Sequence, residues 1–160
     1  MDQLFKGNIQ IVKDALSHKG LNCKILDLPT STRTAEEAAS TIGCTVSEIA
    51  KSLIFKTKNS GRPILVLVSG QNRVNEKTLE SHIGEEIRKA DADFAKEITG
   101  FSIGGIAPIG HKEKIEIVFV DEDLFNFDNV WVAAGTSNAV FNIKINDLLS
   151  ITNGQKIKIT

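Results

Sequence analysis

The sequence predicts an α/β fold built on one mixed, strongly curved sheet with helices around it. Apolar runs rich in β-branched residues alternate along the chain with segments of helical periodicity, which is typical of this class. Some neighbouring runs are separated only by a hairpin-length turn, as KNSGR separates SLIFKT from PILVLVS. Hairpins put antiparallel strands into the sheet, so we expect a mixed sheet rather than a doubly wound parallel one.

Helices are predicted where apolar residues recur at helical spacing and a capping residue precedes them. Thr34 with Glu37 has the form of a capping box, as has Thr45 with Glu48, and Gly43 is placed to end a helix. The predicted helices cover residues 5–16, 35–42, a short turn from 45 to 48, 78–83, 91–98 and 147–149. The predicted strands cover residues 23–28, 52–57, 63–69, 114–120, 129–134, 139–145 and 156–159.

Composition indicates one ordinary globular domain over residues 1–160. Hydrophobic residues make up 41% and charged residues 24% of the chain. The formal net charge of −1 gives no bulk signal for nucleic acid, so any contact with RNA requires a local basic cluster. The two cysteines lack metal-type spacing, which favours a reduced, cytoplasmic setting. With no bilayer-length apolar run and no signal-peptide pattern, no membrane partner is expected.

Two segments could carry chemistry. The string EIAKSLIF places Lys51 between a short helix and an apolar strand. Lys51 is either a strand-end lysine with a packed stem, or a point charge aimed at a phosphate or an oxyanion. The loop IGGIAPIG, residues 103–110, combines glycines, which permit close approach of a ligand, with a proline that fixes the chain direction. Such a loop can aim several N–H groups at one oxygen, although glycine-rich turns are common.

The remaining polar candidates are less specific. AAGTSNAVF ends one strand and opens another, so its short polar groups either contact a substrate or form a Ser/Thr-type turn. His111 follows the glycine-rich loop and is expected at the surface beside Lys112 and Lys114. No Ser-His-Asp set, phosphate-binding loop or zinc pattern is present, so an enzyme here would act without an obvious protein nucleophile, metal or cofactor.

Four ordered strings resemble one family. TAEEAASTIGCTVSEIAKSLIFK, PILVLVSGQNRVNEKTLESHIG, ITGFSIGGIAPIGHK and VWVAAG are similar in content and order to the YbaK/prolyl-tRNA synthetase editing-domain superfamily, over residues 34–149. The resemblance implies a barrel-like, mixed α/β fold with a cleft for the tRNA acceptor end. It also implies hydrolysis of the ester that joins a mischarged amino acid to the terminal adenosine. The expected partners are that acceptor end and, as a candidate, an aminoacyl-tRNA synthetase.

The resemblance also assigns roles to residues. Lys51 would engage the terminal nucleotide. The family's GxxxP loop, whose backbone amides would position the aminoacyl carbonyl and limit side-chain size, maps onto Gly104, Gly105, Ile106, Ala107 and Pro108. An aminoacyl ester is already activated, so an aligned water and a stabilised oxyanion could suffice. A basic face for RNA would comprise Lys51, Lys56, Lys58, Arg62, Arg73 and Lys77.

One segment departs from parts of the family. Some editing members carry a histidine there, and the cysteine-specific type carries a Gly-Lys-Arg string. This chain has the candidate substrate-binding residues Gly135, Thr136, Ser137 and Asn138. The predicted function is therefore a trans-editing deacylase for a small, non-cysteine amino acid. The alternatives are a non-catalytic module of the same fold that binds tRNA or an amino acid, and a Cys-tRNA(Pro) deacylase in which the substrate's own thiol attacks.

Overall fold

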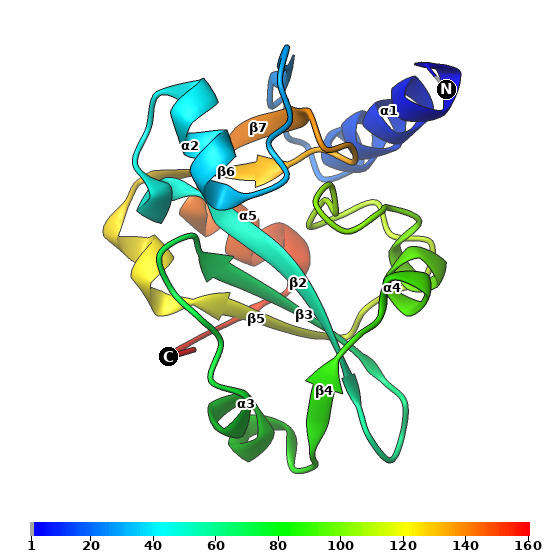
Figure 1. Ribbon diagram of the computed structural model, residues 1–160, viewed down its shortest axis with the longest axis vertical. Helices are drawn as coiled ribbons and strands as arrows, with labels where there is room; N and C mark the ends of the chain where they lie inside the picture. Colours follow the sequence, from blue (N-terminus) through cyan, green and yellow to red (C-terminus); the bar gives the residue numbers. More distant parts are fainter. Residues whose placement is uncertain (1) are drawn as a thin grey trace.

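The computed structural model describes residues 2–160, with side chains from residue 7 onward, and its strands divide between two sheets (Figure 1). The larger sheet is mixed: β2 pairs antiparallel with β3 and β4, whereas β3–β5 and β5–β8 are parallel. Its strands, in order across the sheet, are β4 (Ile87–Lys89), β2 (Ala50–Thr57), β3 (Pro63–Ser69), β5 (Ile117–Asp121) and β8 (Gln155–Ile157).

The smaller sheet is antiparallel. Its strands, in order, are β1 (Ile25–Asp27), β7 (Ala139–Lys144) and β6 (Asn129–Ala133). A single isolated bridge, between Ile49 and Trp131, joins the start of the β2 segment to β6. The mixed α/β class is confirmed, but the strongly curved, barrel-like sheet is not supported. Among the described residues the strands pair as two separate sheets, and neither sheet closes on itself.

Several helices begin at a side-chain cap and end at a glycine in the left-handed conformation. Thr34 Oγ1 accepts a hydrogen bond from Glu37 N–H at 3.1 Å, and Gly43 adopts a φ of 87° at the other end of the same helix. The α-helices are α1 (Asp2–His18), α2 (Ala35–Ile42), α3 (Glu76–Ile83), α4 (Ala92–Thr99) and α5 (Ile145–Thr152). Two 3₁₀ turns, η1 (Val46–Glu48) and η2 (Glu122–Asn126), complete the set. None of the described helices is long and apolar enough to cross a membrane.

Strand β3 is buried on both faces, which explains its continuous apolar run. Leu65 and Leu67 face a large core that also receives residues of the smaller sheet, α1, α4 and α5. Val66 and Val68 face a second core beneath Leu79 of α3. The larger sheet is thereby held rigidly, and β2 lies beside β3 as the strand that carries the candidate site.

Most predicted elements are confirmed within a few residues, and the exceptions are informative. The hairpin and the helix over 35–42 agree with β2–β3 and α2. The predicted strands at 114–120 and 156–159 are shorter or shifted in the structure, as β5 and β8. β4 was not predicted, because three residues flanked by charges carry no apolar run. The side chain of Phe5, expected on the apolar face of the first helix, lies outside the described residues.

Candidate functional site

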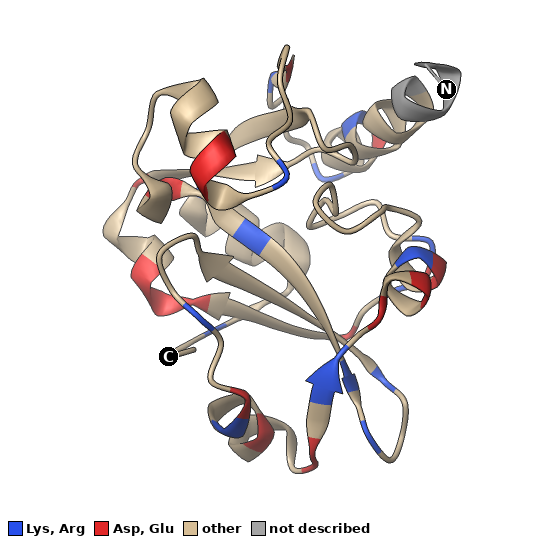
Figure 2. Ribbon diagram, viewed as in Figure 1, with Lys and Arg blue, Asp and Glu red and all other residues tan. Residues whose placement is uncertain are grey.

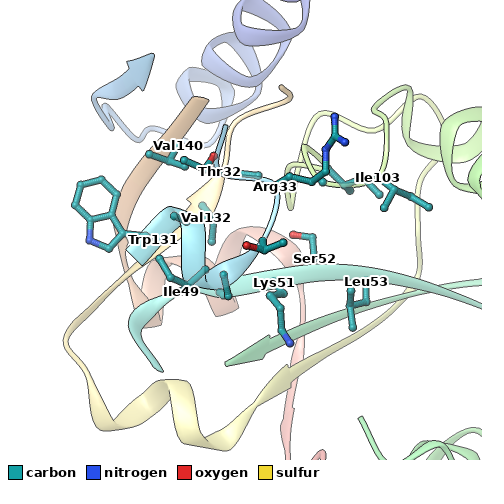
Figure 3. Close-up of a pocket in the computed structure, with 17 residues that line it drawn as sticks. Thr32, Arg33, Ile49, Lys51, Ser52, Leu53, Ile103, Trp131, Val132 and Val140 are labelled. Atoms are coloured by element: carbon teal, nitrogen blue, oxygen red, sulfur yellow. The ribbon is translucent and has the colours of Figure 1, made fainter. Parts of the chain in front are cut away.

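Lys51 lies within β2, where it pairs with Val68, rather than between a helix and a strand. Successive side chains of a strand point to opposite faces, and Figure 3 shows Lys51 and Ser52 directed to opposite sides of β2. Lys51 Nζ donates a hydrogen bond to the backbone oxygen of Asn72 at 3.2 Å. The ammonium group is thus held against the connection between β3 and α3.

The charges around Lys51 come from four other segments, which carry Glu36, Arg73, Lys89 and Asp121. Burial is the largest effect and lowers the pKa of Lys51. The nearby charge of Glu36 opposes that shift, whereas Arg73 and Lys89 add to it. Lys51, Arg73 and Lys89 line one open groove of about 920 Å³, with Glu36 and Glu76 as its acidic members. Figure 2 shows basic segments of β2, β4 and the β3–α3 connection around this face of the sheet.

A second, smaller cavity meets the groove at Lys51 and Leu53. It has a volume of about 150 Å³ and lies between β2, the start of α2, β6 and the glycine-rich loop (Figure 3). Its wall is mostly apolar and is formed by Thr32, Arg33, Thr34, Ala35, Ala38, Ile49, Ala50, Lys51, Ser52, Leu53, Ile103, Gly104, Ile106, Trp131, Val132, Ala133 and Val140. We call this cavity the apolar pocket. It draws residues from both sheets, at the place where the Ile49–Trp131 bridge joins them.

The glycine-rich loop presents only part of itself to the apolar pocket. Gly104 and Ile106 line the pocket, whereas Gly105, Ala107 and Pro108 do not. The N–H of Gly105 is used internally, donating to Ser102 O at 2.9 Å. The N–H groups of Gly104 and Ile106 have no hydrogen-bond partner among the residues that the structure describes. These two amides are therefore the loop's candidate donors to a ligand oxygen.

At both Gly104 and Gly105 a side chain would lie too close to neighbouring atoms. Gly104 has a φ of 96°, and a Cβ there would lie 2.5 Å from Arg33 Cγ. At Gly105 a Cβ would lie 2.6 Å from the backbone carbonyl carbon of Thr136. The loop consequently packs directly on the segment that follows β6.

That segment supports the loop and does not line the apolar pocket. Thr136 Oγ1 accepts hydrogen bonds from Asn138 N–H at 3.3 Å and Ala139 N–H at 3.1 Å, which is a Ser/Thr-type turn. The Ser137 backbone oxygen accepts from both the N–H and the hydroxyl of Thr32. Gly135, Thr136, Ser137 and Asn138 are all absent from the pocket wall. The segment orients Thr32, which does line it.

His111 was expected at the surface, and in the structure it is half-buried. Its ring Nε2 lies 2.7 Å from Ala107 O and, because a carbonyl oxygen only accepts, the ring donates. The ring packs edge-on against Phe101, with centroids 6.3 Å apart. Burial lowers the pKa of His111, which favours the neutral ring. His111 therefore fixes the C-terminal half of the glycine-rich loop from behind.

Comparison with known proteins now assigns the family. The family model described as "Aminoacyl-tRNA editing domain" matches residues 30–151. The chain belongs to this family. The editing domain is 32% identical to the Bacillus subtilis protein "Uncharacterized protein YwhH" over 78% of each chain. It is 34% identical to a proline–tRNA ligase of Limosilactobacillus fermentum over 68% of this chain, but spans only 20% of that ligase.

Solved structures agree with this assignment. One described as a "putative trans-editing enzyme for prolyl tRNA synthetase" is 38% identical, with a TM-score of 0.89 over 96% of both chains. The resemblance to the editing-domain superfamily is thereby confirmed, and with it a role in tRNA editing is supported.

The sequence identified part of the editing domain's pocket and missed the rest. Lys51, Gly104 and Ile106 were singled out, and the structure brings them together at one pocket. The sequence did not single out Arg33, Ser52 or Trp131, which also line the pocket, because none of them belongs to a distinctive pattern. No group of three or more His, Cys, Asp and Glu side chains that could hold a metal ion occurs among the described residues.

Proposed function

We propose that this editing domain hydrolyses the ester of a small mischarged aminoacyl-tRNA. In this proposal the aminoacyl group occupies the apolar pocket and the terminal nucleotide of the tRNA occupies the groove. The observation that carries the proposal is that pocket and groove meet at Lys51. An aminoacyl ester of tRNA also has two parts, a small aminoacyl group and a phosphate-bearing nucleotide.

The size of the pocket supports a small amino acid. A dry cavity of about 150 Å³ in another protein accommodates benzene, a molecule of about six heavy atoms. The apolar pocket has a comparable volume of about 150 Å³. Alanyl, seryl, cysteinyl and 2-aminobutyryl groups stay within this limit and threonyl exceeds it by a single heavy atom, whereas aromatic and long-chain aminoacyl groups exceed it clearly.

The cations of the groove support the proposal that the groove binds the terminal nucleotide of the tRNA. Lys51, Arg73 and Lys89 lie close enough for the last two to lower the pKa of Lys51. A bound phosphate would relieve the mutual repulsion of these three cations, so binding and charge neutralisation act together. The net charge of −1 over the whole chain is compatible with this, because the contact is confined to one groove.

The chemistry proposed for the pocket uses water as the nucleophile. Neither Cys nor His nor a carboxylate belongs to the pocket wall. The amides of Gly104 and Ile106 would stabilise the oxyanion that forms when water attacks the ester carbonyl. Lys51 would hold the nucleotide so that the carbonyl meets those amides. No cofactor or metal has a role in this scheme.

A deacylation panel tests the proposal. Purified protein is incubated with alanyl-, seryl-, cysteinyl-, threonyl- and 2-aminobutyryl-tRNA, and with phenylalanyl-tRNA as the oversized control. We expect hydrolysis above the spontaneous rate for at least one small aminoacyl group and none for phenylalanyl-tRNA. Hydrolysis confined to cysteinyl-tRNA would favour the Cys-tRNA deacylase alternative. Tight tRNA binding without hydrolysis of any substrate would favour the non-catalytic module.

A further inference from the structure

Ser52 is the residue of the apolar pocket whose polar group is unsatisfied. It lies in β2, on the face opposite Lys51, and its side chain points toward the pocket (Figure 3). Its Oγ is buried and has no hydrogen-bond partner among the residues that the structure describes. A buried hydroxyl without a partner carries an uncompensated desolvation penalty, which is rare in folded proteins.

The other polar side chains of the pocket wall are already engaged or directed elsewhere, and the free amides of Gly104 and Ile106 are the proposed donors to the ester carbonyl. Thr32 Oγ1 donates to Ser137 O at 2.9 Å, and Thr34 Oγ1 caps α2 by accepting from Glu37 N–H. Lys51 Nζ points to the groove and donates to Asn72 O. The Arg33 guanidinium extends away from Ser52 in Figure 3. For a ligand hydroxyl that enters this apolar pocket, Ser52 Oγ is therefore the wall hydroxyl whose donor and acceptor capacities are both unused among the described residues.

Resting on the proposed function, we propose that Ser52 is a specificity residue that selects aminoacyl groups bearing a side-chain hydroxyl, seryl and threonyl, over their apolar isosteres. A substrate hydroxyl supplies the missing hydrogen bond and relieves the penalty at Ser52. An isosteric methyl group leaves the Ser52 hydroxyl unpaired and buried. Discrimination between two ligands of equal size is strong when a site has a polar group that only one of them satisfies.

The test compares seryl-tRNA with 2-aminobutyryl-tRNA, which differ by a hydroxyl in place of a methyl group. The tRNA body, the ester and the α-amino group are the same in both. We expect the parent protein to hydrolyse seryl-tRNA about tenfold faster in single turnover, the effect of one hydrogen bond. In Ser52→Ala that ratio falls to about one. The matched control is Ser81→Ala, which removes the hydroxyl of an exposed serine of α3 outside the pocket and leaves the ratio within about twofold of the parent.

The outcomes separate this inference from the function on which it rests. Thermal melting first establishes that Ser52→Ala is folded, which is expected because alanine fits the same strand position. If neither substrate nor any other aminoacyl-tRNA of the panel is hydrolysed, both the proposed function and the role of Ser52 are overturned. Hydrolysis with a ratio that Ser52→Ala leaves unchanged overturns the role of Ser52 alone. Equal slowing of both substrates also overturns it, because the hydroxyl would then contact a group common to all aminoacyl esters.

Discussion

Gly104 and Gly105 are adjacent, yet the structure assigns them different tasks. Gly104 faces the apolar pocket and the flexible Arg33 side chain, whereas Gly105 faces the Thr136 backbone. A flexible side chain can move aside, but a backbone cannot. The first glycine is therefore expected to matter for chemistry and the second for stability.

The two alanine substitutions should separate these tasks. Gly104→Ala adds a side chain at a φ of 96°, with strain on the order of 1 kcal/mol, and displaces the amide proposed as an oxyanion donor. We expect single-turnover hydrolysis to slow on the order of a hundredfold, with tRNA affinity retained. Gly105→Ala should lower the melting temperature more than Gly104→Ala does. A loss of tRNA binding in Gly104→Ala, with the chemical step intact, would show the loop to be a nucleic-acid contact instead.

His111 should make stability depend on pH. Its pKa is lowered from 6.5 by burial, so the unfolded chain binds a proton more readily than the folded chain just below pH 6.5. The free energy of unfolding should therefore fall as pH drops from 7 to 5.5. His111→Gln removes this contribution, and urea unfolding at the two pH values measures it. An identical pH dependence in the variant and the parent would refute the assignment.

At the scale of elements, the β3–α3 connection is held by a buried carboxylate at the end of β5. Asp121 is 1% exposed and accepts hydrogen bonds from Ser69 N–H at 3.0 Å and from the Asn72 amide at 2.9 Å. Asn72 in turn accepts from Lys51 through its backbone oxygen. Three elements, β2, β3 and β5, are thus linked through one connection to the site.

Removing that carboxylate should destabilise the protein. Asp121→Ala leaves the buried Ser69 N–H without a partner and removes one of the two carboxylates that accept from the Asn72 amide, so we expect a loss of about 2 kcal/mol in the free energy of unfolding. Asp128→Ala, at an exposed position, is the control and should change it by less than about 0.5 kcal/mol. Denaturant titration of both variants gives the comparison. Equal stability of the two would mean that the Asp121 hydrogen bonds contribute nothing net.

The elements also show what the sequence could predict. Local signals were sufficient for α2, because its cap Thr34 and its terminal Gly43 are adjacent to it in the chain. The pairing of β7 with both β1 and β6 was not predictable in this way, because β1 lies over a hundred residues from β7. The residues of the candidate site divide in the same way, into those with a sequence signal and those without one. Local patterns and the family resemblance indicated Lys51 and Gly104. Ser52 differs from an ordinary strand serine only in its buried hydroxyl, which has no hydrogen-bond partner among the described residues.

At the scale of the whole molecule, the division into two sheets creates the site. The larger sheet contributes β2, with Lys51 on one face and Ser52 on the other. The smaller sheet contributes Trp131, Val132 and Val140, and α2 adds Ala35 and Ala38 to the pocket wall. A closed barrel would have filled this space with core side chains. The open junction leaves room for the apolar pocket beside a charged groove.

The most direct test of this account is single-turnover deacylation by Lys51→Ala, measured together with tRNA binding and thermal melting. The substrate is the small aminoacyl-tRNA that the parent protein hydrolyses fastest. Because Lys51 lies where the pocket and the groove meet, we predict that hydrolysis falls close to the spontaneous rate while the melting temperature stays within a few degrees of the parent. Hydrolysis at nearly the parental rate by a folded Lys51→Ala protein would contradict the account. The ester would then be cleaved without the residue that lies where the pocket and the groove meet.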